Sequence, residues 1–372
     1  MPLAVPQINW INQRLYDVRS KEGSNTFNYF GPSPALQRIV AATAAQGQIL
    51  TITPPALNTS WSLDFWGPAI HCSEVTGSER TSISDNYGSF LRDLLSGGSS
   101  PPAYLSWPNQ KPFRGSNGTW ELDTRPLRRN GRGETTLFIA YDAARRKSPW
   151  PVYTDIADDA GVRALGGWSA ILGNVTMLKC NLYNASYSVD FNYSTGQQDI
   201  TVERSQETED RLLYGWLSFR LPRGPTQSFN CTTDVTGQTD TTCFSAALAK
   251  TASYQAIHDA FSSHIYGQID SRIGTFSLGT VSTSAVQKTI LTETPELEFL
   301  QFEDDGQGDS QVNSPVFVGR DPATYPRPGA LIDALERLFE NVTISVLSSA
   351  YFQWVHLSIV QLQDTTNAMN LD

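Results

Sequence analysis

Few residue patterns in this sequence could support catalysis. The stretch Gly167-Trp168-Ser169-Ala170-Ile171 begins like the nucleophile elbow of a serine hydrolase, but it lacks the glycine that closes that motif. His258 and His264 are six positions apart and face different sides of the helix expected there, which is poor spacing for a shared metal ion. We therefore interpret these two histidines, together with His71 and His356, as structural.

An acidic, glycine-containing stretch over 303–310 is the strongest candidate for a cation site. Asp304, Asp305 and Asp309 offer the hard oxygen ligands that Ca²⁺ prefers. Their spacing does not match an EF-hand, and loops of this composition are usually solvated turns. The sequence thus predicts no cofactor and no metal, with these three aspartates kept as calcium candidates only.

The chain has 4 cysteines, an even number that suits disulfides. Cys231 and Cys243 enclose a short segment rich in Thr and Asp, whereas Cys72 and Cys180 are far apart in sequence. Neither spacing resembles a zinc ligand set, because no CxxC or His-x-His motif stands nearby. Free buried thiols are the alternative to disulfide bonds.

Acceptors for N-linked sugars point to the same oxidising environment, although their number only mildly exceeds chance. Asn184 and Asn192 are eight residues apart, so they lie on the same face of an extended strand. A further match at Asn230 directly precedes Cys231, which argues against glycosylation there if that thiol is oxidised early. The predicted acceptors are Asn58, Asn117, Asn174, Asn184, Asn192 and Asn341.

One octet occurs twice, as Asn-Thr-Ser-Trp-Ser-Leu-Asp-Phe over Asn58–Phe65 and Asn-Ala-Ser-Tyr-Ser-Val-Asp-Phe over Asn184–Phe191. Polar and apolar residues alternate strictly in both copies. Because side chains alternate across a strand, each copy predicts a half-buried strand with one wet face. If the two strands run antiparallel, Cys72 comes close to Cys180, and a bond between these two cysteines is predicted.

Periodicity predicts helices over 32–46, 244–266 and 331–347. A turn is expected at Trp66–Pro68, and the alternation slips phase near Asn181–Tyr183, which suggests a bulge or a turn there. The predicted fold class is mainly β, an antiparallel β-sandwich with about three helical insertions. Strands are expected over 48–52, 135–141, 199–203, 211–221, 277–292 and 297–302.

The domain organisation expected from the sequence is an irregular N-terminal segment over 1–31, a single extracytoplasmic β-rich domain over 32–350 and a C-terminal tail over 351–372. A formal net charge of −10 argues against a nucleic-acid partner, which requires clustered positive charge. We find no secretory signal at the start of the chain and no apolar run of about 18 residues that could span a membrane.

Three stretches, Asn58–Cys72, Lys179–Tyr187 and Leu335–Ser345, resemble a large family of uncharacterised multi-pass membrane glycoproteins of ascomycete fungi. In that family a glycosylated ectodomain lies between N-terminal transmembrane helices and a C-terminal one. The resemblance covers most of residues 35–350 and implies an extracytoplasmic, disulfide-bonded domain, but no activity. At the ends the chain departs from the family, because no membrane helix precedes the domain and the apolar run over 351–360 is too short to span.

The sequence therefore favours a non-enzymatic, glycosylated ectodomain at the fungal cell surface, on the extracellular or luminal side of a membrane. Its partner would be a ligand in the cell wall or outside the cell, unless its role is structural. Membrane attachment is expected from the family resemblance only. The alternative is a carbohydrate-active hydrolase on a β-sandwich, which would need two carboxylates in a cleft beside an exposed tryptophan.

Overall fold

The structure is a computed structural model of the 372-residue chain. It describes residues 2–20, 26–84, 102–108, 113–114, 120–121, 136–141, 175–205, 218–220, 246–270, 285–297, 329–359 and 361–362.

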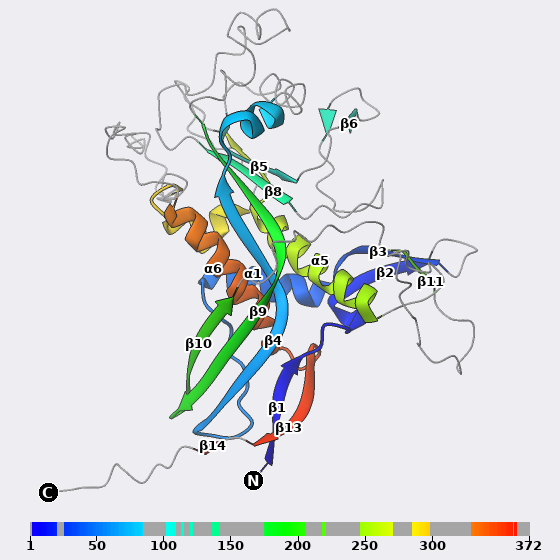
Figure 1. The fold of residues 1–372 in the computed structure, drawn as a ribbon, viewed down its shortest axis with the longest axis vertical. Helices are drawn as coiled ribbons and strands as arrows, with labels where there is room; N and C mark the ends of the chain where they lie inside the picture. The colour runs from blue at the N-terminus through cyan, green and yellow to red at the C-terminus, as the bar shows by residue number, and fades with distance from the viewer. Residues whose placement is uncertain are drawn as a thin grey trace, which may run out of the picture.

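Two long antiparallel strands, β4 (Thr59–Glu74) and β9 (Thr176–Ser194), run side by side through the middle of the molecule (Figure 1). The repeated octets lie in these strands and pair with each other. Leu63 is opposite Val189, and each octet's Asp lies opposite the other octet's Ser. The two copies are therefore related by a local two-fold axis near Leu63 and Val189.

The other strands of the seven-stranded sheet attach along the edges of this pair. β8 (Thr136–Tyr141) pairs with the first half of β9, and β5 (Pro102–Pro108) and β12 (Gly267–Asp270) follow outward. β10 (Gln197–Ser205) pairs with the second half of β9, while β14 (Gln361–Leu362) pairs with the start of β4. Positive φ angles at Thr195 and Gly196 (52° and 82°) make the β9–β10 connection a two-residue hairpin turn.

Strands also form in the N-terminal segment predicted to be irregular over 1–31, and in residues 353–359 and 361–362 of the tail predicted over 351–372. β1 (Pro2–Ile8) pairs antiparallel with β13 (Gln353–Ile359), as the blue and red arrows of Figure 1 show. Each segment satisfies the other's backbone groups, a partnership across the whole chain that local patterns do not reveal.

Smaller ladders complete the strands. β2 (Tyr16–Ser20) follows the short turn η1 (Gln13–Leu15) and pairs with β3 (Thr26–Pro32), which also pairs with β11 (Ser218–Arg220). A two-residue ladder joins β6 (Phe113–Arg114) to β7 (Trp120–Glu121).

The three predicted helices are present. α1 (Pro34–Gln46) begins where the Ser33 hydroxyl accepts from the Leu36 N–H, and it ends at Gly47, whose φ of 69° suits glycine. α5 (Ala246–Ile265) is buried around most of its circumference. α6 (Gly329–Ser345) continues into the turn η8 (Val346–Ser348).

The β4–β9 pair is buried on opposite faces at its two ends. Near the cysteines, Ile70, Leu178 and Leu182 belong to a core shared with α1, α5 and α6. In the octet half, Leu63 and Val189 belong to a second core on the other face. That core includes Val5 of β1 and the end of α6 with η8.

This change of buried face explains the phase slip near Asn181–Tyr183, and the predicted bulge or turn there is wrong. The register runs without a shift from Ser60 opposite Asn192 to Glu74 opposite Leu178. Along β9 the buried apolar residues change from even to odd positions because the face that is covered changes. The strand itself stays regular.

The turn predicted at Trp66–Pro68 is also wrong, because β4 continues through these residues. Pro68 is tolerated because its nitrogen lies on the edge of β4 that pairs with no neighbouring strand there, so the N–H that proline lacks has no strand partner to lose. Side chains satisfy the carbonyls along this edge. Tyr254 donates to the Trp66 oxygen at 2.9 Å, and Tyr187 and Thr343 donate to the Pro68 oxygen at 2.8 and 3.0 Å.

Two further strand predictions fail because side chains satisfy the backbone. Residues 48–52 are irregular, since the Gln198 amide accepts from the Ile52 N–H and donates to the carbonyls of Ile49 and Leu50. The described part of 277–292 forms the turns η4 (Val286–Lys288) and η5 (Ile290–Glu293). Threonine hydroxyls there bond to carbonyls three residues back, which competes with strand pairing.

Of the remaining strand predictions, two are confirmed and a third is confirmed in part, whereas Leu297, the one described residue of 297–302, lies in a turn. Strands at 135–141 and 199–203 correspond to β8 and β10. Of 211–221 the structure describes 218–220, which form β11, and residues 298–302 lie outside the described residues.

The fold combines a large antiparallel sheet with helices, as predicted, but it is not clearly mainly β. In the described part of the chain, α1, α5 and α6 share one core with the sheet. On the octet core, β1 of the two-stranded β1–β13 ladder contributes Val5, and among the described strands no second large sheet of the kind that a β-sandwich requires faces this core.

Replacing Gly47 tests the junction between α1 and η5. A Cβ at Gly47 would lie 2.8 Å from Cγ1 of Ile290, and the φ of 69° disfavours any L side chain. We expect Gly47→Ala to lower the free energy of unfolding by about 2–4 kcal/mol, from backbone strain plus overpacking. Gly77→Ala is the control, because its φ is 57° but its Cβ would meet nothing within 4 Å. If urea unfolding showed that Gly47→Ala and Gly77→Ala lose equal free energy of unfolding, this would contradict the packing of η5 on α1.

Candidate functional site

The exposed face of the octet half presents polar side chains from neighbouring strands of the sheet. Its side chains alternate with the buried ones along three neighbouring strands. We call it the polar face; its residues are Ser60, Ser62, Asp64 and Trp66 of β4, Ser186, Ser188, Asp190 and Asn192 of β9, and Asp199, Thr201, Glu203 and Ser205 of β10. The wet face predicted from the octets is therefore confirmed.

Reciprocal hydrogen bonds connect the two octets across this face. The Ser188 hydroxyl donates to Oδ1 of Asp64 at 2.7 Å, and the Ser62 hydroxyl donates to Oδ1 of Asp190. The exchange follows from the local two-fold, which sets each Asp opposite a Ser. Each carboxylate is thereby held in place while its other oxygen has no hydrogen bond within the described chain.

Trp66 is the one large aromatic side chain on the polar face. It is 38% exposed, whereas Trp61 is 7% exposed and stacks on Phe191 with ring centroids 4.8 Å apart. Trp66 lies opposite Ser186 and two residues from Asp64. An exposed indole beside carboxylates and hydroxyls is a surface that can stack on a ring or a cation.

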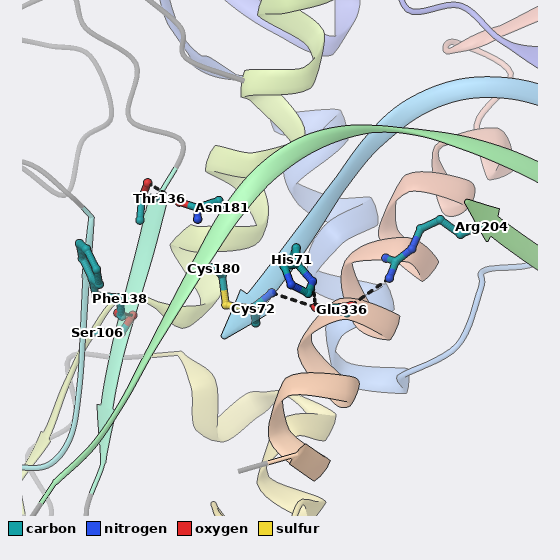
Figure 2. The surroundings of a disulfide bond; sticks show 9 residues. All are labelled: His71, Cys72, Ser106, Thr136, Phe138, Cys180, Asn181, Arg204 and Glu336. Atoms are coloured by element: carbon teal, nitrogen blue, oxygen red, sulfur yellow. Dashed lines mark hydrogen bonds and ion pairs between the residues drawn. A yellow bond between two sulfur atoms is a disulfide. The ribbon is translucent and has the colours of Figure 1, made fainter. Parts of the chain in front are cut away.

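At the other end of the strand pair, Cys72 lies directly opposite Cys180, and the two form the disulfide that the antiparallel pairing predicts (Figure 2). Both residues are buried. The bond closes a sequence separation of 108 residues and locks the β4–β9 register.

Glu336 of α6 lies beside this disulfide and connects three elements (Figure 2). Its Oε1 accepts from the Cys72 N–H at 2.8 Å and lies 3.0 Å from Nδ1 of His71. Its Oε2 accepts from Nη2 of Arg204 on β10 at 2.9 Å. One carboxylate thus satisfies a backbone N–H on the unpaired edge of β4 and pairs with a cation from β10, two strands away.

Small residues make room for the Arg204 side chain. The hollow beside it is lined by Ala69, Ile70, His71, Tyr183, Ala185 and Arg204. It measures about 10 Å³, enough for roughly one water molecule. The contacts of Glu336 make this place a structural junction, and the hollow beside Arg204 is too small for a substrate.

Glu340, one turn after Glu336, shares this environment. Burial raises the pKa of its carboxyl group, Arg204 and Arg337 lower it, and the charge of Glu336 raises it again. Its Oε2 lies 3.8 Å from Nε of Arg204.

The histidines occupy different settings. His71 is half exposed beside Glu336, and His258 is buried on α5 near Asp259. Asp259 accepts from the Tyr29 hydroxyl at 2.7 Å, and burial, together with the charge of Asp259, raises the pKa of Tyr29 well above its usual value. Burial lowers the pKa of His264.

The predicted glycan acceptors that can be placed differ in accessibility. Asn192 lies on the polar face, and Asn58 adjoins it with its Oδ1 accepting from the Thr195 N–H at 2.8 Å. Asn184 is partly buried, and its Oδ1 accepts from the Tyr254 hydroxyl at 3.0 Å. Nδ2 of Asn341, the atom that would carry a sugar, donates to the Gly47 carbonyl at 2.9 Å.

Several predicted site residues lie outside the described residues, and those predictions stay open. They are Cys231, Cys243, Asn117, Asn174, Asp304, Asp305 and Asp309. Within the ranges that the structure covers, no group of His, Cys, Asp or Glu side chains is arranged to hold a metal ion.

Sequence reasoning missed Trp66, Arg204 and Glu336. For Arg204 the sequence contained one clue. It stands an even number of residues from Ile200 and Val202, so it lies on the same, core-facing side of β10. A charged residue at a buried parity requires a partner, but the sequence does not show that the partner is on α6.

Comparisons with protein-family models, with curated proteins and with solved structures found no match. The resemblance to the fungal membrane glycoproteins therefore stays a prediction. Among the helices that the structure describes, none is long and apolar enough to cross a membrane.

Removing the Glu336 carboxylate tests the junction. We expect Glu336→Ala to lower the free energy of unfolding by about 2–3 kcal/mol, because the Cys72 N–H and Arg204 lose their acceptor. Asp333→Ala is the control, since Asp333 is exposed on the same helix. Similar losses in the two variants, measured by urea unfolding, would mean that the contacts of Glu336 do not stabilise the fold.

The raised pKa of Glu340 predicts a pH dependence of stability. The folded state holds this proton more tightly than the unfolded state, so the stabilisation is present below the unfolded pKa and is lost as pH rises through the raised folded pKa. The Glu340→Gln variant lacks this titrating group. As pH rises from 4 to 7, its free energy of unfolding should therefore fall less than that of the wild-type chain. Parallel stability curves for the two proteins between pH 4 and 7 would contradict the shift.

Proposed function

We propose that this chain is an extracytoplasmic, glycosylated binding domain without catalytic activity, exposed at the surface of a fungal cell. The observation that carries the proposal is the Cys72–Cys180 disulfide in the central strand pair, combined with a polar face bordered by Asn58 and Asn192. Disulfides form and persist mainly in oxidising compartments, where acceptors of this kind are also modified.

The construction of the polar face supports a binding role. Its side chains project from three hydrogen-bonded strands whose opposite face is packed into a core, so they are presented on a rigid base. Reciprocal Ser–Asp hydrogen bonds fix two of its carboxylates in the absence of any partner. A preordered surface loses little conformational entropy on binding.

The alternative of a carbohydrate-active hydrolase receives less support. Asp64 and Asp190 lie on the same face as Trp66, but they stand on an open sheet surface that does not exclude water. Glycoside hydrolysis needs two carboxylates on either side of a bound sugar. A fungal origin, membrane attachment and a completed β-sandwich are parts of the proposal that rest on the resemblance and on the strand pattern.

A non-reducing peptide map of the protein from its own cells tests the compartment. We expect a Cys72–Cys180 peptide, a Cys231–Cys243 peptide, and sugar on Asn58 or Asn192. Occupancy at Asn341 should be lower, because its Nδ2 already donates to the Gly47 carbonyl in the folded chain. Free thiols together with unmodified asparagines would rule out the extracytoplasmic proposal.

A further inference from the structure

We infer that the polar face binds a cationic, hydroxyl-rich polymer, namely a chain of amino sugars with free ammonium groups. This inference rests on the proposed binding function and names its partner.

The charge of the polar face selects a cation. Asp64, Asp190, Asp199 and Glu203 all project from it, and none of its side chains is basic. The nearest basic residue in sequence, Arg204, lies on the core side of β10 and pairs with Glu336. The chain as a whole carries a formal charge of −10, so the long-range field also favours a cationic partner.

Trp66 favours a partner with a ring and a positive charge. An exposed indole attracts cations over its face and stacks on the apolar side of a saturated ring. Its position two residues from Asp64 allows one sugar unit to stack while its ammonium group reaches a carboxylate.

The spacing of the acidic residues favours an extended polymer over a single small cation. Neighbouring strands lie about 4.8 Å apart, so Asp64 on β4 and Glu203 on β10 are separated by roughly 10 Å across β9. The hydroxyls of Ser62, Ser188 and Thr201 lie between and beside these carboxylates. Hydroxyls that both donate and accept match a partner that carries hydroxyls as well as ammonium groups.

The test is calorimetric titration of the full chain with a glucosamine hexasaccharide, at a mildly acidic pH where the amines are protonated and the carboxylates ionised. Asp64→Asn/Asp190→Asn/Glu203→Gln should weaken binding about tenfold or more. Asparagine keeps an oxygen for each serine hydroxyl, so the fold should survive. Trp66→Ala should weaken binding about threefold to fivefold. Added salt should weaken binding to the wild-type chain.

The charge-matched control removes three exposed carboxylates away from the polar face, through Glu79→Gln/Glu293→Gln/Asp333→Asn. It should bind the hexasaccharide as the wild type does. Thermal unfolding of every variant establishes that it is folded.

Three results would overturn the inference. Absence of binding would do so, as would equal binding of the N-acetylated hexasaccharide, which lacks the positive charge. Equal binding of hexalysine with no effect of Trp66→Ala would assign the face to basic peptides. These results leave the disulfide and glycan map unaffected, so failure of this inference is distinguishable from failure of the proposed compartment.

Discussion

The register between β4 and β9 is the constraint on which the rest of the structure depends. Because side chains alternate along a strand, a slip of one residue would exchange the buried and exposed sets of an entire strand. Two features at opposite ends fix this register: the Cys72–Cys180 disulfide and the reciprocal Ser–Asp pairs of the octets. Both cores and the polar face depend on this register. Each of them is formed by every second residue in one half of the β4–β9 pair.

The free edge of β4 imposes a second requirement, which α6 and α5 meet with side chains. Unpaired backbone groups on a strand edge would recruit another strand or remain unsatisfied in the interior. Glu336 accepts from the Cys72 N–H, and the hydroxyls of Thr343 and Tyr254 donate to carbonyls farther along the strand. Pro68 removes a donor in the same stretch. This edge of β4 is therefore covered, whereas the polar face is exposed.

The features that the sequence predicts well are those encoded by local periodicity. The strand alternation of the octets and the three helices follow from spacing alone, whereas the proximity of Cys72 to Cys180 follows only once the two octet strands are taken as antiparallel neighbours. The predicted bulge failed because an alternation that changes phase has two causes, a defect in the strand or a change in what covers it. Pairing of β1 with β13 and of Arg204 with Glu336 joins distant segments, and nothing in either segment specifies the other.

The polar face carries more acidic residues than folding requires. Core packing in the octet half uses the odd positions of β4 and β9, so the even positions are free of packing constraints and neutral polar residues would be sufficient there. Carboxylates gathered on one face repel each other, which lowers stability, and the residues of β4, β9 and β10 that form the polar face include no basic side chain to offset this. The Ser62 and Ser188 hydroxyls offset part of this repulsion, but they satisfy only one oxygen of each aspartate. A cationic partner would relieve the remainder, which gives the acidic composition a functional explanation that the fold alone does not supply.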